Sequence, residues 1–164
     1  MFKAKKNATS AIVQHRARLV THGFSQVLGV DYFDMFAPIT HLASIWTFLA
    51  FAATEDYETG QIDIESAYLN GELTEDKVIF MRQAPGYKMV DEKKGVLVCR
   101  SKKSLYGLKQ AGQQWYQKLV GIMMKLGFGR CEGDKAVFYR RYERMNVLII
   151  VLVYIDDCTI VGKN

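Results

Sequence analysis

Residues 147–162 read VLIIVLVYIDDCTIVG, and this stretch decides the fold. The unbroken run of β-branched and aliphatic residues up to Val153 predicts a buried strand, and a second short apolar run follows from Cys158. Because only a few residues separate the two runs, they predict a hairpin. We expect the acidic pair, Asp156 and Asp157, to form its turn.

Two neighbouring carboxylates repel each other and are costly to remove from water, so a positive partner is expected beside them. Oxygen ligands at the tip of a rigid hairpin suit Mg²⁺, which takes one or two protein carboxylates and completes its shell with water and phosphates. The alternative is a solvated turn, which Asp residues favour on turn preference alone. A third carboxylate would favour the metal.

Asp63 supplies that carboxylate. It lies in residues 61–73, QIDIESAYLNGEL, where a strand predicted from Glu58 to Ile64 ends and a turn or helix begins. The separation in sequence between Asp63 and Asp156 is compatible with two strands of one sheet, but it does not by itself bring them together.

Four ordered blocks of this chain resemble the reverse transcriptase of copia-type LTR retrotransposons. They are ARLVTHGFSQVLGVDYFDMFAPIT (17–40), QIDIESAYLNGEL (61–73), SLYGLKQAGQQWYQKL (104–119) and VYIDDCTIVG (153–162). The resemblance implies an α+β fold of the right-hand polymerase type, with fingers and an antiparallel palm sheet backed by helices. It further implies that residues 1–164 are a single partial reverse transcriptase domain, from which the family's thumb and RNase H are absent.

The same resemblance implies an RNA-directed DNA polymerase that adds deoxynucleotides to a primer on an RNA or DNA template. Its catalytic and metal-binding residues would be Asp63, Asp156 and Asp157, with the Ile64 backbone as a further metal ligand. Two Mg²⁺ ions, or Mn²⁺ in their place, would be held between these groups and a deoxynucleoside triphosphate.

Further site residues follow from the resemblance. The nucleotide would contact Arg16 and Arg18, which alternate along a predicted strand, the backbone of Glu65, Ser66 and Ala67, and the aromatic gate Tyr68. The template and primer would contact Tyr106, Gly107, Lys109, Gln110 and Tyr154. Without the family, the arginines fit a solvated strand face and Tyr68 fits core packing.

Some positions depart from the family pattern. The chain has Gly112 and Gln113 where the family commonly has Pro and Arg, and His41 and Trp46 near positions where it usually has arginines. These departures favour an alternative function, an inactive transposon remnant with residual nucleic-acid binding. The intact acidic residues and Tyr68 argue against complete decay.

The composition of the chain is sufficient for one hydrophobic core, and its positive charge favours a polyanionic partner. The chain has 164 residues, 49% of them hydrophobic, a net charge of +5 and a pI near 9.1. Its three cysteines are widely spaced, which indicates reduced thiols. No apolar run approaches the roughly 20 residues that span a bilayer. We therefore expect an intracellular protein, cytoplasmic or nuclear, with no membrane partner and no secretory signal.

Two helices and a loose end complete the expectations. A helix should run from about residue 42 to Thr54, capped by Thr40, and bury Leu42, Ile45, Trp46, Leu49 and Ala53. A second should run from Gln114 to Leu126, bury Trp115, Leu119, Ile122, Met123 and Leu126, and end at Gly127. The polar residues up to Gln14 indicate a loosely held end, before a strand predicted from Ile12 to Phe24. Other strands are predicted at 78–81, 95–100 and 136–139.

Overall fold

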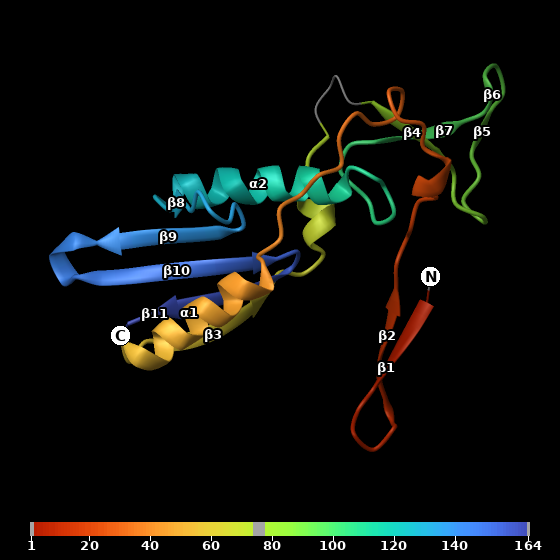
Figure 1. Ribbon diagram of the computed structural model, residues 1–164. Coiled ribbons are helices and arrows are strands. Elements are labelled where there is room, and N and C mark those ends of the chain that lie inside the picture. The colour runs from red at the N-terminus through yellow and green to blue at the C-terminus, as the bar shows by residue number, and fades with distance from the viewer. Residues whose placement is uncertain (1, 74–77, 164) are drawn as a thin grey trace.

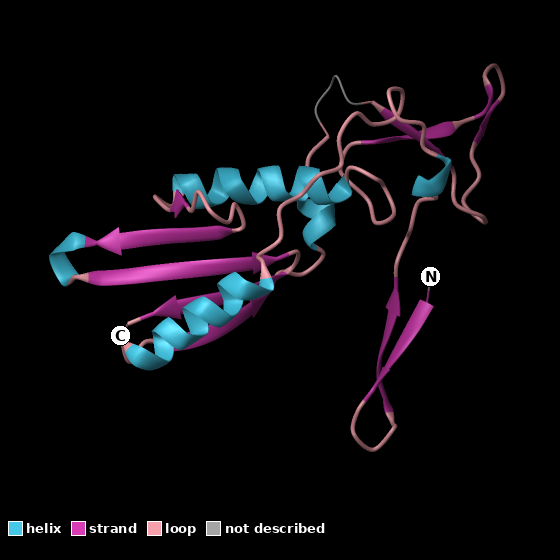
Figure 2. Cartoon of the chain, in the orientation of Figure 1, coloured by secondary structure: helices cyan, strands magenta, loops and turns pink. Residues whose placement is uncertain are grey.

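The computed structural model describes residues 2–73 and 78–163, and it is a mixed α+β structure, as predicted (Figure 1). A five-stranded antiparallel sheet in the order β3-β11-β10-β9-β8 forms its centre (Figure 2). Its strands are β3 (Glu58–Asp63), β8 (Gly129–Arg130), β9 (Val137–Tyr142), β10 (Val147–Tyr154) and β11 (Asp157–Gly162). Two longer helices pack on it, α1 (Leu42–Thr54) and α2 (Ala111–Lys125).

Strand β10 is central to the sheet and is covered on both faces. Its side chains alternate, so that Val151 and Val153 pack in one cluster with helix α2, whereas Ile150 and Leu152 pack in another with helix α1. A strand that is buried on both faces needs apolar residues at every position. This requirement explains why the run in β10 is unbroken rather than alternating.

Smaller elements lie outside this sheet. Three two-stranded antiparallel pairs join β1 (Phe2–Lys6) to β2 (Ile12–Ala17), β4 (Ile79–Arg82) to β7 (Val98–Ser101), and β5 (Val90–Asp91) to β6 (Gly95–Val96). Short 3₁₀ helices are η1 (Gly23–Ser25), η2 (Ala67–Asn70) and η3 (Glu143–Met145). None of the helices within the described residues is long and apolar enough to cross a membrane.

The N-terminal segment is more ordered than expected. The predicted loose end contains β1, which pairs with β2 in a hairpin whose register sets Phe2 opposite Ala17, although every residue of β1 is exposed. The strand predicted from Ile12 also ends earlier than expected, at Ala17. Figure 1 shows this hairpin extending away from the central sheet. Its two strands satisfy each other's backbone groups, which a polar composition does not reveal.

Helix α1 starts within two residues of the predicted cap, but the cap itself was assigned wrongly. The Thr40 hydroxyl donates to the carbonyl of Val153 at 2.8 Å, so Thr40 ties the helix start to β10. Capping comes from Asp134, whose carboxylate accepts hydrogen bonds from the His41 amide at 2.9 Å and the Ser44 hydroxyl at 2.7 Å. A distant residue therefore satisfies the backbone amide of the N-cap residue and binds the Ser44 side chain in the first turn.

The buried face of α1 also differs from the prediction. Leu42 and Trp46 are 67% and 64% exposed, whereas Ala52 is buried and Phe48 and Phe51 pack against the core cluster beside it. The helix sequence LASIWTFLAFAAT is apolar on nearly every side, so its periodicity does not distinguish one face from another.

Helix α2 begins at Ala111, three residues before the predicted start. Its end agrees with the prediction, because Gly127 has φ +78°, the left-handed conformation typical of a residue that closes a helix. Trp115, Leu119 and Met123 are buried as expected. Two assignments were wrong, since the side chains predicted at the end of the stripe, Ile122 and Leu126, are 41% and 52% exposed.

Candidate active site at the end of the central sheet

The two aspartates of the β10–β11 hairpin occupy different positions. Tyr154 pairs directly with Asp157, so the turn consists of Ile155 and Asp156, and Asp157 is the first residue of β11. The prediction that both aspartates form the turn is therefore half wrong. Strand pairing therefore fixes the backbone of Asp157, whereas Asp156 lies at the tip of the hairpin.

Asp63 lies beside this hairpin. Strand β3 runs antiparallel to β11, and its last residue, Asp63, is directly opposite Asp157. Residues opposite each other in neighbouring antiparallel strands place their side chains on the same face of the sheet, with Cβ atoms about 5 Å apart. Tyr154, Asp157 and Asp63 consequently form one row across three strands.

The chemistry of this end of the sheet fits a divalent cation. Asp63 and Asp157 are both exposed and Asp156 is half-buried, so their oxygens can reach solvent and a substrate. Among the described residues, the ion pairs join His41 to Asp134 and Lys118 to Glu72, and none neutralises these three acids. Adjacent carboxylates without a cation repel each other, and hard oxygen donors are the ligands that Mg²⁺ prefers.

The side chains themselves do not converge on one point. Within residues 2–73 and 78–163, no group of three or more His, Cys, Asp or Glu side chains is arranged to hold a metal ion. The backbone nevertheless links the strand ends, because the Ile64 amide donates to the carbonyl of Asp156 at 2.8 Å. The strands therefore bring the three acids to one end of the sheet without closing a coordination shell.

The segment after β3 is compact. Ser66 adopts the left-handed conformation at φ 54°, and η2 begins directly after it with Ala67, which is 2% exposed. Glu65 stays exposed. The Ile64 amide donates its hydrogen bond to the Asp156 carbonyl. A phosphate bound at this segment would therefore accept hydrogen bonds from the backbone amides of residues 65–67.

Tyr68 lines the same cavity as Ile155 of the β10–β11 turn, and its ring lies beside that of Tyr106. Its ring centroid lies 5.5 Å from that of Tyr106, and the guanidinium carbon of Arg18 lies 5.1 Å from the Tyr106 centroid. Burial raises the pKa of the Tyr68 hydroxyl, and the nearby charge of Asp156 and the Tyr106 hydroxyl raise it further. Tyr68 therefore remains a neutral hydrogen-bond donor at neutral pH.

The structure separates the two arginines that the sequence grouped. Arg18 reaches Tyr106, whereas Arg16 lies in β2 opposite Lys3 of the N-terminal hairpin. Figure 1 shows that hairpin apart from the central sheet, on the side that the β10–β11 turn faces. Only Arg18 is therefore brought to the predicted nucleotide site.

The Tyr106–Gln110 loop is held against residues that the sequence analysis did not single out. The Tyr106 carbonyl accepts a hydrogen bond from the Thr21 amide at 2.8 Å. Gln110 is 4% exposed, and its side chain bonds to the Gln26 side chain at 3.2 Å and to the Asp31 carbonyl at 3.1 Å. Gln110 thus fixes the loop, and the neighbouring Lys109 is left as its exposed cation.

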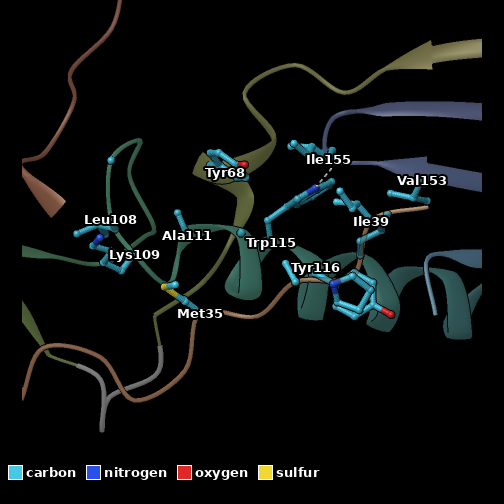
Figure 3. Close-up of a pocket in the computed structure, with 15 residues that line it drawn as sticks. Met35, Ile39, Tyr68, Leu108, Lys109, Ala111, Trp115, Tyr116, Val153 and Ile155 are labelled. Carbon is cyan, nitrogen blue, oxygen red and sulfur yellow. Dashed lines mark hydrogen bonds between the residues drawn. The ribbon is translucent and has the colours of Figure 1, made fainter. Parts of the chain in front are cut away.

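A cavity of about 280 Å³ lies behind the hairpin turn (Figure 3). Its lining combines Tyr68, Leu108 and the start of α2 with Val153 and Ile155. Trp115 lines it too, and its indole Nε1–H donates to the Ile155 carbonyl at 2.8 Å. The sequence predicted Trp115 in the buried stripe of a helix but not this bond, although a buried indole usually finds a hydrogen-bond partner.

Comparison with known proteins shows the family of the chain. The family model described as reverse transcriptase (RNA-dependent DNA polymerase) matches residues 1–164. No solved structure matches the chain.

Relatives come from plants and yeast. The chain is 40% identical over its full length to the retrovirus-related Pol polyprotein from transposon TNT 1-94 of Nicotiana tabacum, of which it covers 12%. It is 34% identical over its full length to the polyprotein from transposon RE1 of Arabidopsis thaliana, covering 11%, and 30% identical to the Ty1-BL Gag-Pol polyprotein of Saccharomyces cerevisiae, covering 8%. The chain therefore spans about a tenth of the length of these relatives.

Proposed function

Because this chain belongs to the reverse transcriptase (RNA-dependent DNA polymerase) family, of the copia type, we propose that it is the fingers and palm portion of an RNA-directed DNA polymerase. In this proposal residues 1–164 are one partial right-hand polymerase domain, which adds deoxynucleotides to a primer annealed to an RNA or DNA template. The observation that carries the proposal is the register that sets Asp63 opposite Asp157, next to Asp156 at the hairpin tip.

Asp63, Asp156 and Asp157 would hold two divalent ions, Mg²⁺ or Mn²⁺, with the Ile64 carbonyl as a further ligand. Family members generally use divalent ions, and the donor set described above suits them. When bound, such ions would lower the pKa of the primer 3′-hydroxyl and neutralise the triphosphate and its leaving group. The protein's own part is to fix the carboxylates on a paired strand end, so that little reorganisation is needed during the reaction.

The nucleotide would lie over Tyr68, with its phosphates along residues 64–67. Arg18, which lies against Tyr106, would reach those phosphates as a cation, and Arg16 would need the N-terminal hairpin to move toward the site. The half-buried Tyr68 ring is backed by Tyr106, which would keep it rigid beneath the sugar. A rigid ring at that place excludes a 2′-hydroxyl, the group that distinguishes ribonucleotides.

The template and primer would follow the face formed by the Tyr106–Gln110 loop and Tyr154. Tyr106 and Lys109 supply an aromatic ring and a cation, which suit stacked bases and phosphates. Gly107 has φ +92°, and a side chain there would meet the Thr21 carbonyl, so glycine lets the loop pack closely while its backbone would face the strand. Tyr154 is 46% exposed beside Asp157 and would contact the primer end.

Primer extension tests the proposal. The purified chain should extend a DNA primer on an RNA template with Mg²⁺ or Mn²⁺, and Asp156→Asn should abolish extension while template binding is retained. Asp56→Asn is the matched control, because Asp56 is exposed and has a left-handed φ of 54° that Asn tolerates. Extension that survives in Asp156→Asn would sink the assignment.

A second candidate function is an inactive remnant that binds nucleic acid. It is favoured by Gly112 and Gln113, which replace the family's usual Pro and Arg, and by the side chains of the three acids, which do not converge in the described residues. Template binding without extension, in wild type and Asp156→Asn alike, would select it.

A further inference from the structure

The turn between β10 and β11 has a backbone conformation that its sequence disfavours. Ile155 has φ 61°, in the left-handed region. The other non-glycine residues with positive φ among those described are polar, namely Ser10, Asp56, Ser66 and Asn146. A β-branched residue in this region is an outlier, because its side chain crowds the backbone. Such a conformation persists only where the surroundings enforce it.

A two-residue hairpin turn needs a positive φ at its first residue, and Ile155 occupies that position. Two hydrogen bonds from outside the hairpin then hold the peptide groups of this turn. The Trp115 indole Nε1–H donates to the Ile155 carbonyl at 2.8 Å, and the Ile64 amide donates to the Asp156 carbonyl at 2.8 Å. Each carbonyl belongs to a planar peptide unit that includes an Asp156 backbone atom. The two donors therefore fix the two peptide planes that flank Asp156, and so the direction of its side chain.

Trp115 is suited to this task by its own surroundings. It is 4% exposed, and it packs in the core cluster that includes Ala67 and Val153. Figure 3 shows the indole edge pointing from helix α2 to Ile155, with the dashed line marking the bond. A ring immobilised in this way presents its N–H at a constant position.

We propose that Trp115 is a positioning residue, which aims the Asp156 carboxylate by fixing the strained Ile155–Asp156 peptide through its indole N–H. The effect on catalysis rests on the proposed function, whereas the effect on the hairpin does not. The alternative is that Trp115 merely fills the core, in which case its ring would matter and its N–H would not.

Helix α2 offers a matched control next to Trp115. Tyr116 is 8% exposed, and its hydroxyl donates to the Lys135 carbonyl at 2.6 Å, away from the turn. Trp115→Phe and Tyr116→Phe thus each remove one buried donor to a backbone carbonyl and keep an aromatic ring. Trp115→Phe also shrinks the buried ring and leaves a cavity, so benzothienylalanine at position 115, which keeps the ring shape without the N–H, is the variant that separates the two roles.

The first readout is amide NMR and hydrogen exchange at residues 155–157 and at Ile64. Trp115→Phe should shift the signals at 155–157 and reduce the protection of the Ile64 amide by about tenfold, and Tyr116→Phe should leave both unchanged. Equal changes in the two variants, or none in either, would overturn the proposal. Benzothienylalanine at position 115 should give the same changes as Trp115→Phe, because it lacks the N–H; wild-type signals and protection in that variant would also overturn the proposal.

The second readout is single-turnover primer extension. Trp115→Phe should lower the rate constant about tenfold and change the nucleotide concentration for half-maximal rate by less than about twofold, since the bond acts on Asp156 rather than on nucleotide affinity. A rate equal to that of Tyr116→Phe would contradict the positioning role. If wild type extends no primer, the proposed function has failed, and the NMR comparison still decides the inference.

Discussion

Asp134 joins elements that are far apart in the chain, and its removal should destabilise the fold measurably. The carboxylate is 6% exposed and accepts three hydrogen bonds, from the His41 amide at 2.9 Å, the Ser44 hydroxyl at 2.7 Å and the Ala136 amide at 3.0 Å. We predict that Asp134→Ala lowers the free energy of unfolding, because it uncaps α1 and leaves donors without an acceptor.

The magnitude follows from those contacts. Loss of the capping bond to the His41 amide costs about 1 kcal/mol, and the Ala136 amide and the Ser44 hydroxyl, left without an acceptor, cost about 1 kcal/mol each, so the total is about 3 kcal/mol. For a chain of this length that loss lowers Tm by about 6–12 °C.

Urea and thermal unfolding of wild type and Asp134→Ala measure the difference. Asp91→Ala is the control, because the Asp91 carboxylate accepts hydrogen bonds from Lys93 and Lys94 within one loop and joins no distant elements. A decrease of less than about 1 kcal/mol in Asp134→Ala, or an equal decrease in Asp91→Ala, would refute the reasoning.

Three further predictions follow from the structure. Burial acts to raise the pKa of Asp134, but hydrogen bonds from Ser44 and from backbone amides outweigh it and hold that pKa below its usual value. The ionised Asp134 carboxylate therefore stabilises the fold fully above about pH 4, and this contribution is lost as pH falls through the lower folded-state pKa. Between pH 6 and pH 2 the free energy of unfolding should consequently fall less steeply in Asp134→Asn than in wild type. Gly107→Ala should destabilise the chain by at least about 2 kcal/mol in urea unfolding, because a methyl group there would overlap the Thr21 carbonyl and φ is +92°; an unchanged midpoint would contradict this packing. Tyr68→Ala should raise the incorporation of ribonucleotides relative to deoxynucleotides by at least about tenfold in primer extension, whereas Tyr68→Phe should not; equal ratios in wild type and Tyr68→Ala would remove the gate from the proposal.

The sequence predicted the parts of the fold that local patterns encode. The apolar run of β10 and the strand ending at Asp63 are where they were expected, and Gly127 closes α2. These features depend on residue type and on short spacings. The family resemblance then identified the polymerase family from four short blocks.

The missed features depend on contacts between distant segments. The turn was placed one residue late, because only the register of Tyr154 with Asp157 shows that Asp157 belongs to the strand. The cap of α1 comes from Asp134, which lies far along the chain, and not from Thr40. The left-handed Ile155 has no signal in its residue type, since isoleucine disfavours this conformation and only the register of the two-residue turn requires it.

Single-turnover addition of one deoxynucleotide by Asp63→Asn tests the central claim most directly. Asp63 reaches the site only through the pairing of β3 with β11, so its role depends on the observed register. The account predicts that Asp63→Asn loses at least about a hundredfold in rate, while template-primer affinity stays within about threefold and Asp56→Asn matches wild type. A rate of nucleotide addition by Asp63→Asn equal to that of wild type would contradict the role of Asp63 in catalysis.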